Sequence, residues 1–189
     1  MKLCVFQGTF NPIHNAHLRM AEFILNEYKF DKILFIPAYR PPHKDYDEGL
    51  SKHRLEMVKL AVKTNENFEI SDIEYNSERP SYTYLTIKEL YKIYDVDDKI
   101  NFIIGTDAFK DIDKWYEAEK LKPLLKFIVF KRANEFTEEI KNCEFEYTTM
   151  PFYDVSSTEI REKIKNGEDI SNYVTKEVKR YIEENGLYK

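Results

Sequence analysis

Short apolar runs alternate with segments of helical periodicity along most of this chain, and this alternation constrains its fold more than any other feature. The runs at 3–6, 32–37, 100–105 and 126–130 are almost continuously apolar, as in strands that are buried on both faces. The intervening segments place apolar residues at helical spacing, for example over 18–28. Strands and helices that alternate in this way predict an α/β protein with a largely parallel sheet.

The remaining elements are consistent with one doubly wound, Rossmann-like sheet with helices on both faces. Weaker strands are predicted at 68–71 and 145–149, and helices after Ser51 and at 83–94, 157–166 and about 172–185. Ser51 is the expected cap of its helix. Glycine commonly ends a helix, and Gly167 and Gly186 follow the last two helices. No repeat or linker interrupts the chain, so we expect a single domain over 1–189, with a C-terminal helical part from about 157.

Composition and charge exclude several classes of protein. The chain has 189 residues, of which 42% are hydrophobic and 33% charged, with a net charge of −5. The acidic balance argues against a nucleic-acid or anionic-membrane binder. The two cysteines, Cys4 and Cys143, form neither a CxxC pair nor a disulfide framework, which favours the reducing cytoplasm. The first apolar run is too short for a signal sequence, and no apolar stretch approaches the ~18 residues of a membrane span.

Polar segments follow the predicted strands at the edge where a parallel sheet binds ligands. Such sheets bind them outside the carboxyl ends of their strands, near the point where the strand order reverses. The segments after the successive strands are 7–17, 38–44, 105–109, 131–134 and 154–161. We therefore expect the chemistry of this protein at that edge.

Two histidines mark the start of the first predicted helix. His14 and His17 are one helical turn apart, and Gly8 before them permits a sharp turn and close approach to a ligand. A helix N-terminus attracts anions through its N–H groups and dipole, so two imidazoles there can bind phosphate. A structural histidine pair and half of a metal site are the alternatives, although the intervening Asn15 and Ala16 do not form an HExxH motif.

A cluster of hydroxyl groups precedes the helix predicted at 157–166. Ser156 and Glu159 fit a capping box, which alone explains the first hydroxyl. Ser157 and Thr158 add two more hydroxyls, and Arg161 adds a guanidinium one turn into the helix. Hydroxyls, amide N–H groups and a guanidinium that converge on one point are suited to holding a polyphosphate.

Weaker candidates each have a structural alternative. Lys44 belongs to a Pro-rich basic loop, and Lys131 and Arg132 follow a buried strand; each could be a solvated surface residue. Asp107 could accept a hydrogen bond from a ribose hydroxyl or cap a helix. Trp115, next to Tyr116, could pack in the core or stack on a flat ring. The chain contains no GxxxxGK[ST], GxGxxG or GxSxG motif.

The segments GTFNPIHNAHL and SSTEIR resemble the HxGH and SSTxIR motifs of the nucleotidylyltransferase superfamily. Within it, the segments PPHK, RPSYTYLT and IGTDAF and the pair at 115–116 resemble the nicotinate-nucleotide adenylyltransferases. Three residues depart from the family pattern: Ala16 replaces the motif glycine, Gln7 replaces a frequent glycine, and Asn11 replaces a frequent aspartate. Alanine is compatible with the motif if residue 16 is helical, although its methyl group limits close approach of a ligand.

The resemblance implies a reaction, its substrates and its cofactor. ATP and nicotinate mononucleotide would give nicotinate adenine dinucleotide and pyrophosphate, with Mg²⁺ that arrives with ATP and has no dedicated protein site. No nucleic-acid or membrane partner is expected, and a homo-oligomer is left open. Nicotinamide mononucleotide or phosphopantetheine as the second substrate, a non-catalytic nucleotide-binding protein and a metal-dependent hydrolase are the alternatives.

The resemblance also assigns roles to residues. It implies catalytic roles for His14, His17, Lys44 and Arg161. It implies ATP binding by Gly8, Thr9, Phe10, Gly105, Asp107, Arg132, Ser156, Ser157 and Thr158. It implies binding of the second substrate by Thr83, Thr86, Trp115 and Tyr116, with the tryptophan stacked on the pyridine ring.

Overall fold

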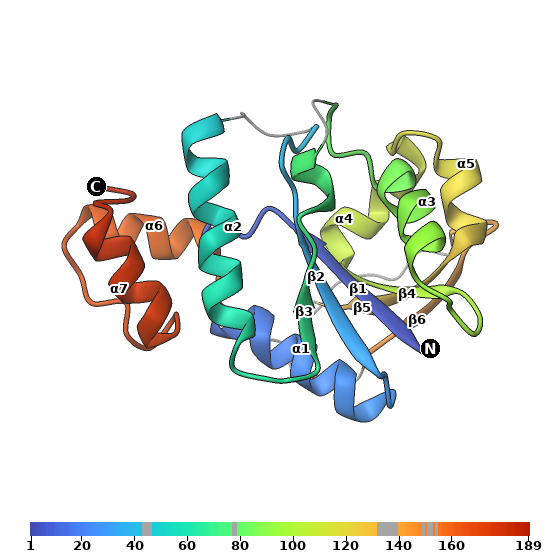
Figure 1. The fold of residues 1–189 in the computed structure, drawn as a ribbon, viewed down its shortest axis with the longest axis horizontal. Helices are drawn as coiled ribbons and strands as arrows, with labels where there is room; N and C mark the ends of the chain where they lie inside the picture. Colours follow the sequence, from blue (N-terminus) through green and yellow to red (C-terminus); the bar gives the residue numbers. More distant parts are fainter. Residues whose placement is uncertain (43–46, 77–78, 132–139, 149, 151–152, 154) are drawn as a thin grey trace.

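Six parallel strands form the centre of the molecule in a computed structural model, which describes residues 1–189 except 43–46, 77–78, 132–139, 149, 151–152 and 154 (Figure 1). The strands are β1 (Leu3–Gly8), β2 (Lys32–Pro37), β3 (Phe68–Ile70), β4 (Ile100–Gly105), β5 (Leu125–Phe130) and β6 (Glu144–Tyr147). They lie in the order β3-β2-β1-β4-β5-β6, and every neighbouring pair is parallel. The predicted α/β, doubly wound, Rossmann-like fold is confirmed.

Helices connect the successive strands from β1 to β5, since neighbouring parallel strands need crossover connections. The α-helices are α1 (Asn15–Glu27), α2 (Glu48–Val62), α3 (Thr83–Ile93), α4 (Thr106–Lys110), α5 (Ala118–Leu121), α6 (Ser157–Lys165) and α7 (Lys176–Glu184). The 3₁₀ turns are η1 (Ile73–Asn76), η2 (Ile112–Lys114) and η3 (Lys122–Leu124). Within the described part of the chain, no helix is long and apolar enough to cross a bilayer.

Strand β1 contributes to two hydrophobic cores because its successive side chains point to opposite faces of the sheet. Cys4 and Phe6 belong to the core that is covered by α1, α2, α6 and α7. Leu3 and Val5 belong to the core beneath α3, α4 and α5. Figure 1 shows the same division, with α6 and α7 extending the layer beyond α2. Helices therefore cover both faces, and the continuous apolar runs of the strands follow from burial on both sides.

The strand order reverses between β1 and β4, and this places a crevice at one edge of the sheet. From β1 the chain crosses to β2 on one side, and from β4 it crosses to β5 on the other. The adjacent strands β1 and β4 end at Gly8 and Gly105, so these two glycines flank the crevice.

One predicted helix cap is wrong. Asp47, not Ser51, caps α2: its carboxylate accepts a hydrogen bond from the N–H of Leu50 at 3.1 Å. Ser51 lies within the first turn and its hydroxyl donates to the carbonyl of Glu48 at 2.7 Å. Aspartate at this position satisfies an N–H group that the helix cannot pair, so the helix begins before Ser51.

Candidate active site

Two adjoining pockets lie at the crevice between β1 and β4. The first, of about 570 Å³, extends over the start of α1 and of α6, and we call it the α1 pocket. The second, of about 560 Å³, extends toward α3 and η2, and we call it the α3 pocket. Residues from the ends of β1 and β4 line both of them: Phe6, Gln7, Gly8, Thr9 and Gly105. A ligand in one pocket can therefore meet a ligand in the other at the ends of these strands.

The turn after β1 depends on Gly8 and Phe10. Phe10 has a φ of 48°, in the left-handed region, and its ring folds back over Gly8. A Cβ at Gly8 would lie 3.1 Å from that ring, so only glycine leaves the ring in place. The same ring contacts the imidazole of His17 edge to face, with centroids 5.1 Å apart. Gly8 thus helps to position a histidine as well as to form a turn.

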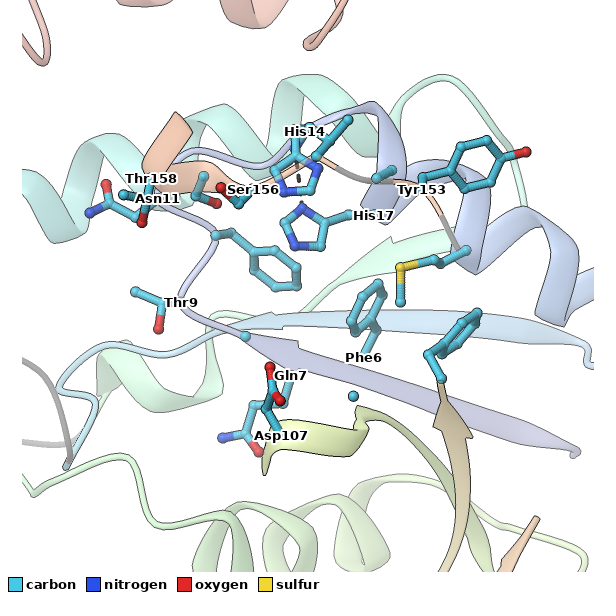
Figure 2. A pocket seen from close by; sticks show the side chains of 18 of the residues that line it. Phe6, Gln7, Thr9, Asn11, His14, His17, Asp107, Tyr153, Ser156 and Thr158 are labelled. Carbon is cyan, nitrogen blue, oxygen red and sulfur yellow. Dashed lines mark hydrogen bonds between the residues drawn. The ribbon is translucent and has the colours of Figure 1, made fainter. Parts of the chain in front are cut away.

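His14 and His17 lie against each other at the start of α1. Their rings are stacked, with centroids 3.7 Å apart (Figure 2). The backbone N–H of His14 donates to Nδ1 of His17 at 3.2 Å. Because Nδ1 accepts this hydrogen bond, the proton of a neutral His17 lies on Nε2, which makes Nε2 a donor.

His14 is held in its neutral form by burial. Only 5% of its surface is exposed, and desolvation lowers its pKa to about 4. Among the described residues, no group forms a hydrogen bond with its buried Nδ1. The described residues also include no group of three or more metal-ligating side chains that could hold a metal ion. His14 is therefore a neutral imidazole whose Nδ1 is shielded from solvent.

The start of α6 is joined directly to the turn that carries the histidines. The hydroxyl of Ser157 donates to the carbonyl of Pro12 at 2.9 Å, and Arg161 donates to the carbonyl of Asn11 at 2.7 Å. The Arg161 guanidinium also donates to the Thr158 hydroxyl at 3.1 Å. The Ser156 hydroxyl accepts the N–H of Glu159, so it caps α6 as predicted. Two stretches about 140 residues apart in the sequence thus form one wall of the α1 pocket.

Aromatic rings line one side of the α3 pocket, and the start of α3 lines another part of it. Trp115 lines it, with its indole edge to face against Phe102 at a centroid distance of 6.3 Å. Tyr116 is 46% exposed and stacks on Tyr82 at 4.4 Å. Thr83 is the first residue of α3, and the first N–H groups of a helix have no partner within the helix. The pocket therefore offers a flat apolar surface and backbone donors for a planar anion.

Most of the predicted site residues line one of these two pockets. The α1 pocket contains Gly8, Thr9, Phe10, His14, His17, Gly105, Asp107, Ser156, Ser157, Thr158 and Arg161. The α3 pocket contains Thr83, Trp115 and Tyr116, together with Gly8, Thr9 and Gly105. Lys44 and Arg132 lie outside the described residues. The roles of these residues stay predictions.

The placement predicted for Thr86 is wrong. Its side chain is buried inside α3, where its hydroxyl donates to the carboxylate of Glu74 at 2.7 Å. Its N–H is taken by the carbonyl of Tyr82 at 3.2 Å, as the first turn of α3 closes. Neither group is left for a ligand, and Thr86 lines neither pocket.

Two residues beside the crevice, Glu74 and Arg54, were not considered as site residues, and the weaker candidate Lys131 lies at the crevice. The buried carboxylate of Glu74 accepts hydrogen bonds from the side-chain amide of Gln7 and the N–H of Tyr39. The buried guanidinium of Arg54 donates to the carbonyls of Thr9 at 2.8 Å and Ala38 at 2.7 Å. Lys131 lines the α1 pocket. No motif marks Glu74 or Arg54, because they act through contacts between distant segments.

Comparison with known proteins agrees with this geometry. Residues 5–163 match the model of the cytidylyltransferase-like family. The chain is 40% identical to the nicotinate-nucleotide adenylyltransferase of Bacillus subtilis, over 100% of this chain and 98% of that protein. It is 39% identical to a protein of Caldicellulosiruptor saccharolyticus named probable nicotinate-nucleotide adenylyltransferase, over 100% of both chains. The solved structure of nicotinic acid mononucleotide adenylyltransferase from Plasmodium falciparum, complexed with APC, is 26% identical with a TM-score of 0.76, covering 98% of this chain and 96% of that one.

The fold and the two joined motif segments define a nucleotidyltransferase of the cytidylyltransferase-like class. Within that class, the chain belongs to the nicotinate-nucleotide adenylyltransferase family, because relatives of that name align with it over its full length.

Proposed function

We propose that this chain transfers the adenylyl group of ATP to nicotinate mononucleotide, giving nicotinate adenine dinucleotide and pyrophosphate for NAD biosynthesis. The observation that carries the proposal is the pair of pockets that meet at the ends of β1 and β4. One has the donors and cations of a phosphate site, and the other has an aromatic wall and a helix N-terminus. Two nucleotides bound there would meet at their phosphates.

The reaction needs no protein nucleophile. An oxygen of the 5′-phosphate of the mononucleotide attacks the α-phosphorus of ATP in line. A new O–P bond forms while the bond from the α-phosphorus to the bridging oxygen breaks, and pyrophosphate leaves with the electron pair. The protein has to position two anions and stabilise the charge that develops.

The α1 pocket is assigned to ATP. His17, through Nε2, and His14 are the proposed donors to the phosphates, since both line this pocket. Arg161 and Thr158 are proposed to hold the β- and γ-phosphates at the start of α6, with Ser156 and Ser157 beside them. Asp107, near the end of β4, is proposed to accept from ribose hydroxyls. Lys44 and Arg132, outside the described residues, are proposed to add positive charge.

Mg²⁺ is proposed to enter with ATP. Bound to the triphosphate, it would neutralise charge on the leaving pyrophosphate. The donor set of the α1 pocket fits this arrangement, since it consists mainly of imidazoles, hydroxyls and a guanidinium, which suit phosphate oxygens better than a Mg²⁺ ion. The protein residues would bind the phosphate oxygens that the Mg²⁺ ion does not contact.

The α3 pocket is assigned to the pyridine nucleotide. Trp115 is proposed to stack on the pyridine ring. N–H groups at the start of α3, near Thr83, and around Tyr116 are proposed to receive the nicotinate carboxylate. Hydrogen bonds to a charged acceptor are stronger than those to a neutral amide, so this site favours the acid over nicotinamide mononucleotide. We place the reaction in the cytoplasm, in keeping with the two free cysteines.

One incubation tests the proposed reaction. The protein is mixed with ATP, Mg²⁺ and either nicotinate or nicotinamide mononucleotide, and the products are identified by mass. We expect nicotinate adenine dinucleotide and pyrophosphate, with a higher kcat/KM for the acid. Hydrolysis of ATP without a dinucleotide, or a preference for the amide, would contradict the proposal.

The role of His17 is tested by His17→Ala. Loss of one donor that stabilises developing charge should lower kcat by about 10²- to 10³-fold. His53→Ala is the matched control, because His53 lies on α2, bonded to Tyr181, and lines neither pocket. Its turnover should match the wild type. Wild-type turnover in His17→Ala, with the far-UV spectrum unchanged, would exclude the assigned role.

A further inference from the structure

The side chain of Asn11 lines the α1 pocket and is held from outside it by the last turn of the chain. The hydroxyl of Tyr188 donates to Oδ1 of Asn11 at 2.6 Å, across 177 positions of sequence. Within the described part of the chain, no hydrogen bond involves Nδ2 of Asn11. An amide whose oxygen is already bonded on one side can offer only its NH₂ group to a ligand.

Tyr188 is suited to fix this orientation. Its ring packs against the core that α6 and α7 share with α1 and α2. Burial raises the pKa of its phenol well above the ordinary value, although Arg54 and Arg161 oppose the change. The phenol therefore keeps its proton at neutral pH and remains a donor. Because the Tyr188 hydroxyl is a donor, the Asn11 amide must direct its oxygen, and not its NH₂ group, toward Tyr188.

The neighbours of Asn11 identify the ligand chemistry that its NH₂ group would meet. Its backbone carbonyl accepts from Arg161, which also bonds the Thr158 hydroxyl. Figure 2 shows Asn11 beside Thr158 and Ser156, at the end of the pocket formed by the start of α6. Arg161, Thr158 and Ser156 can each donate to an oxyanion at this end, whereas the hydroxyl proton of Ser157 is already given to the carbonyl of Pro12.

We propose that Asn11 binds the β- and γ-phosphates of ATP through its NH₂ group, and that Tyr188 is a positioning residue that holds the Asn11 amide in the orientation needed. This inference rests on the proposed function, because it takes the α1 pocket to be the ATP site. Under this proposal the last turn of the chain has two roles: it covers a hydrophobic core, and it completes the ATP site. The contact is specific to chains with asparagine at this position, since the aspartate that is frequent in the family could accept from Tyr188 but would present no donor to phosphate.

Binding of ATP and of AMP to four variants tests the proposal. Asn11→Ala should weaken ATP binding by about 10- to 100-fold, the range for a hydrogen bond to a charged group, and Asn11→Asp should weaken it further by charge repulsion. Tyr188→Phe keeps the ring and should weaken ATP binding by about 3- to 10-fold. AMP binding should change little in all of them. Tyr181→Phe is the matched control, since it removes another tyrosine hydroxyl of the C-terminal helices, bonded to His53, and should bind ATP as the wild type does.

A double variant separates positioning from a merely structural role. If Tyr188 acts through Asn11, adding Tyr188→Phe to Asn11→Ala should weaken ATP binding no further. Full additivity of the two losses, equal losses for AMP and ATP, or wild-type ATP affinity in Asn11→Ala would overturn the proposal. These outcomes are distinct from failure of the proposed function, which would appear as absence of the dinucleotide with the wild-type protein.

Discussion

His14 shows how the burial of one residue couples the stability of the fold to pH. Its imidazole is buried at the start of α1, and its Nδ1 has no partner among the described residues. A buried polar group without a partner destabilises a protein by about 1–3 kcal/mol. The pair of histidines could be predicted from sequence, but the burial of one of them could not, because it depends on the tertiary packing around the turn.

The neutral state of His14 predicts a pH dependence of stability. Its pKa is about 4 in the folded chain and near 6.5 when unfolded, so below pH 6.5 the unfolded chain binds the additional proton. Stability should therefore fall as pH decreases through this window, by about 3 kcal/mol in total at pH 4. The free energy of unfolding in urea, measured at several pH values, checks this for the wild type and His14→Gln.

The comparison with His14→Gln removes the contribution of carboxylates, which titrate in both proteins. The wild type should lose more stability than the variant between neutral pH and pH 4. Parallel pH profiles in the two proteins would show that His14 does not titrate as its burial requires.

Helix α6 begins with residues that serve both the helix and the pocket. Ser156 caps it by accepting the N–H of Glu159, while Ser157 and Arg161 use their side chains to bond the turn after β1. The Ser156 cap could be read directly from the sequence, because the pattern is local, although among the described contacts only the Ser156 half of the predicted capping box is formed. The bonds to Pro12 and Asn11 could not be read from a local pattern, because they join segments that lie far apart in the sequence.

Removal of the α6 cap should separate these two roles. Ser156→Ala should lower the free energy of unfolding by about 1 kcal/mol in the absence of ligand, because one N–H group of the first turn loses its acceptor. Thermal unfolding without and with ATP checks the expectation. Thr175→Ala, which removes the corresponding cap of α7, is the control for a purely structural loss. An unchanged Tm of Ser156→Ala with weakened ATP binding would contradict the capping role.

The prediction of the elements succeeded where the pattern is local. Strands β2 and β4 have the predicted bounds, and α3 begins at the predicted Thr83. Gly167 and Gly186 have positive φ values after α6 and α7, as expected for helix ends. The errors arose where two local signals compete, as at Asp47 and Ser51, or where a residue that a motif places near a ligand is bonded inside the protein, as is Thr86.

For the whole molecule, the important feature is that the two pockets share the ends of β1 and β4. Gly105 lines both pockets, and a Cβ placed on it would meet no atom within 4 Å. Its φ of −83° is accessible to any residue. The resemblance implied ATP binding by Gly105, but only the structure shows that this one position lines both pockets.

Gly105→Ala should therefore impair both substrates without destabilising the fold. The added methyl group would occupy space where the two nucleotides meet, so the KM for each should rise and kcat/KM should fall by about 10- to 10²-fold. The Tm should be unchanged, because no protein atom is displaced. Steady-state kinetics with each substrate varied in turn checks this, and Gly49→Ala in α2, which lines neither pocket, is the control. If Gly105→Ala raised the KM for only one substrate, the two nucleotides would not both approach Gly105, and the prediction would be wrong.

The shared wall at the strand ends has a consequence for what happens after the bond is made. Once the bond is made, the two halves of the dinucleotide are directly linked. While one half stays bound in its pocket, the other half is held at a high effective concentration next to its own pocket. The product should accordingly dissociate more slowly than either starting nucleotide, so departure of the finished molecule, and not the chemical step, becomes the natural limit on turnover.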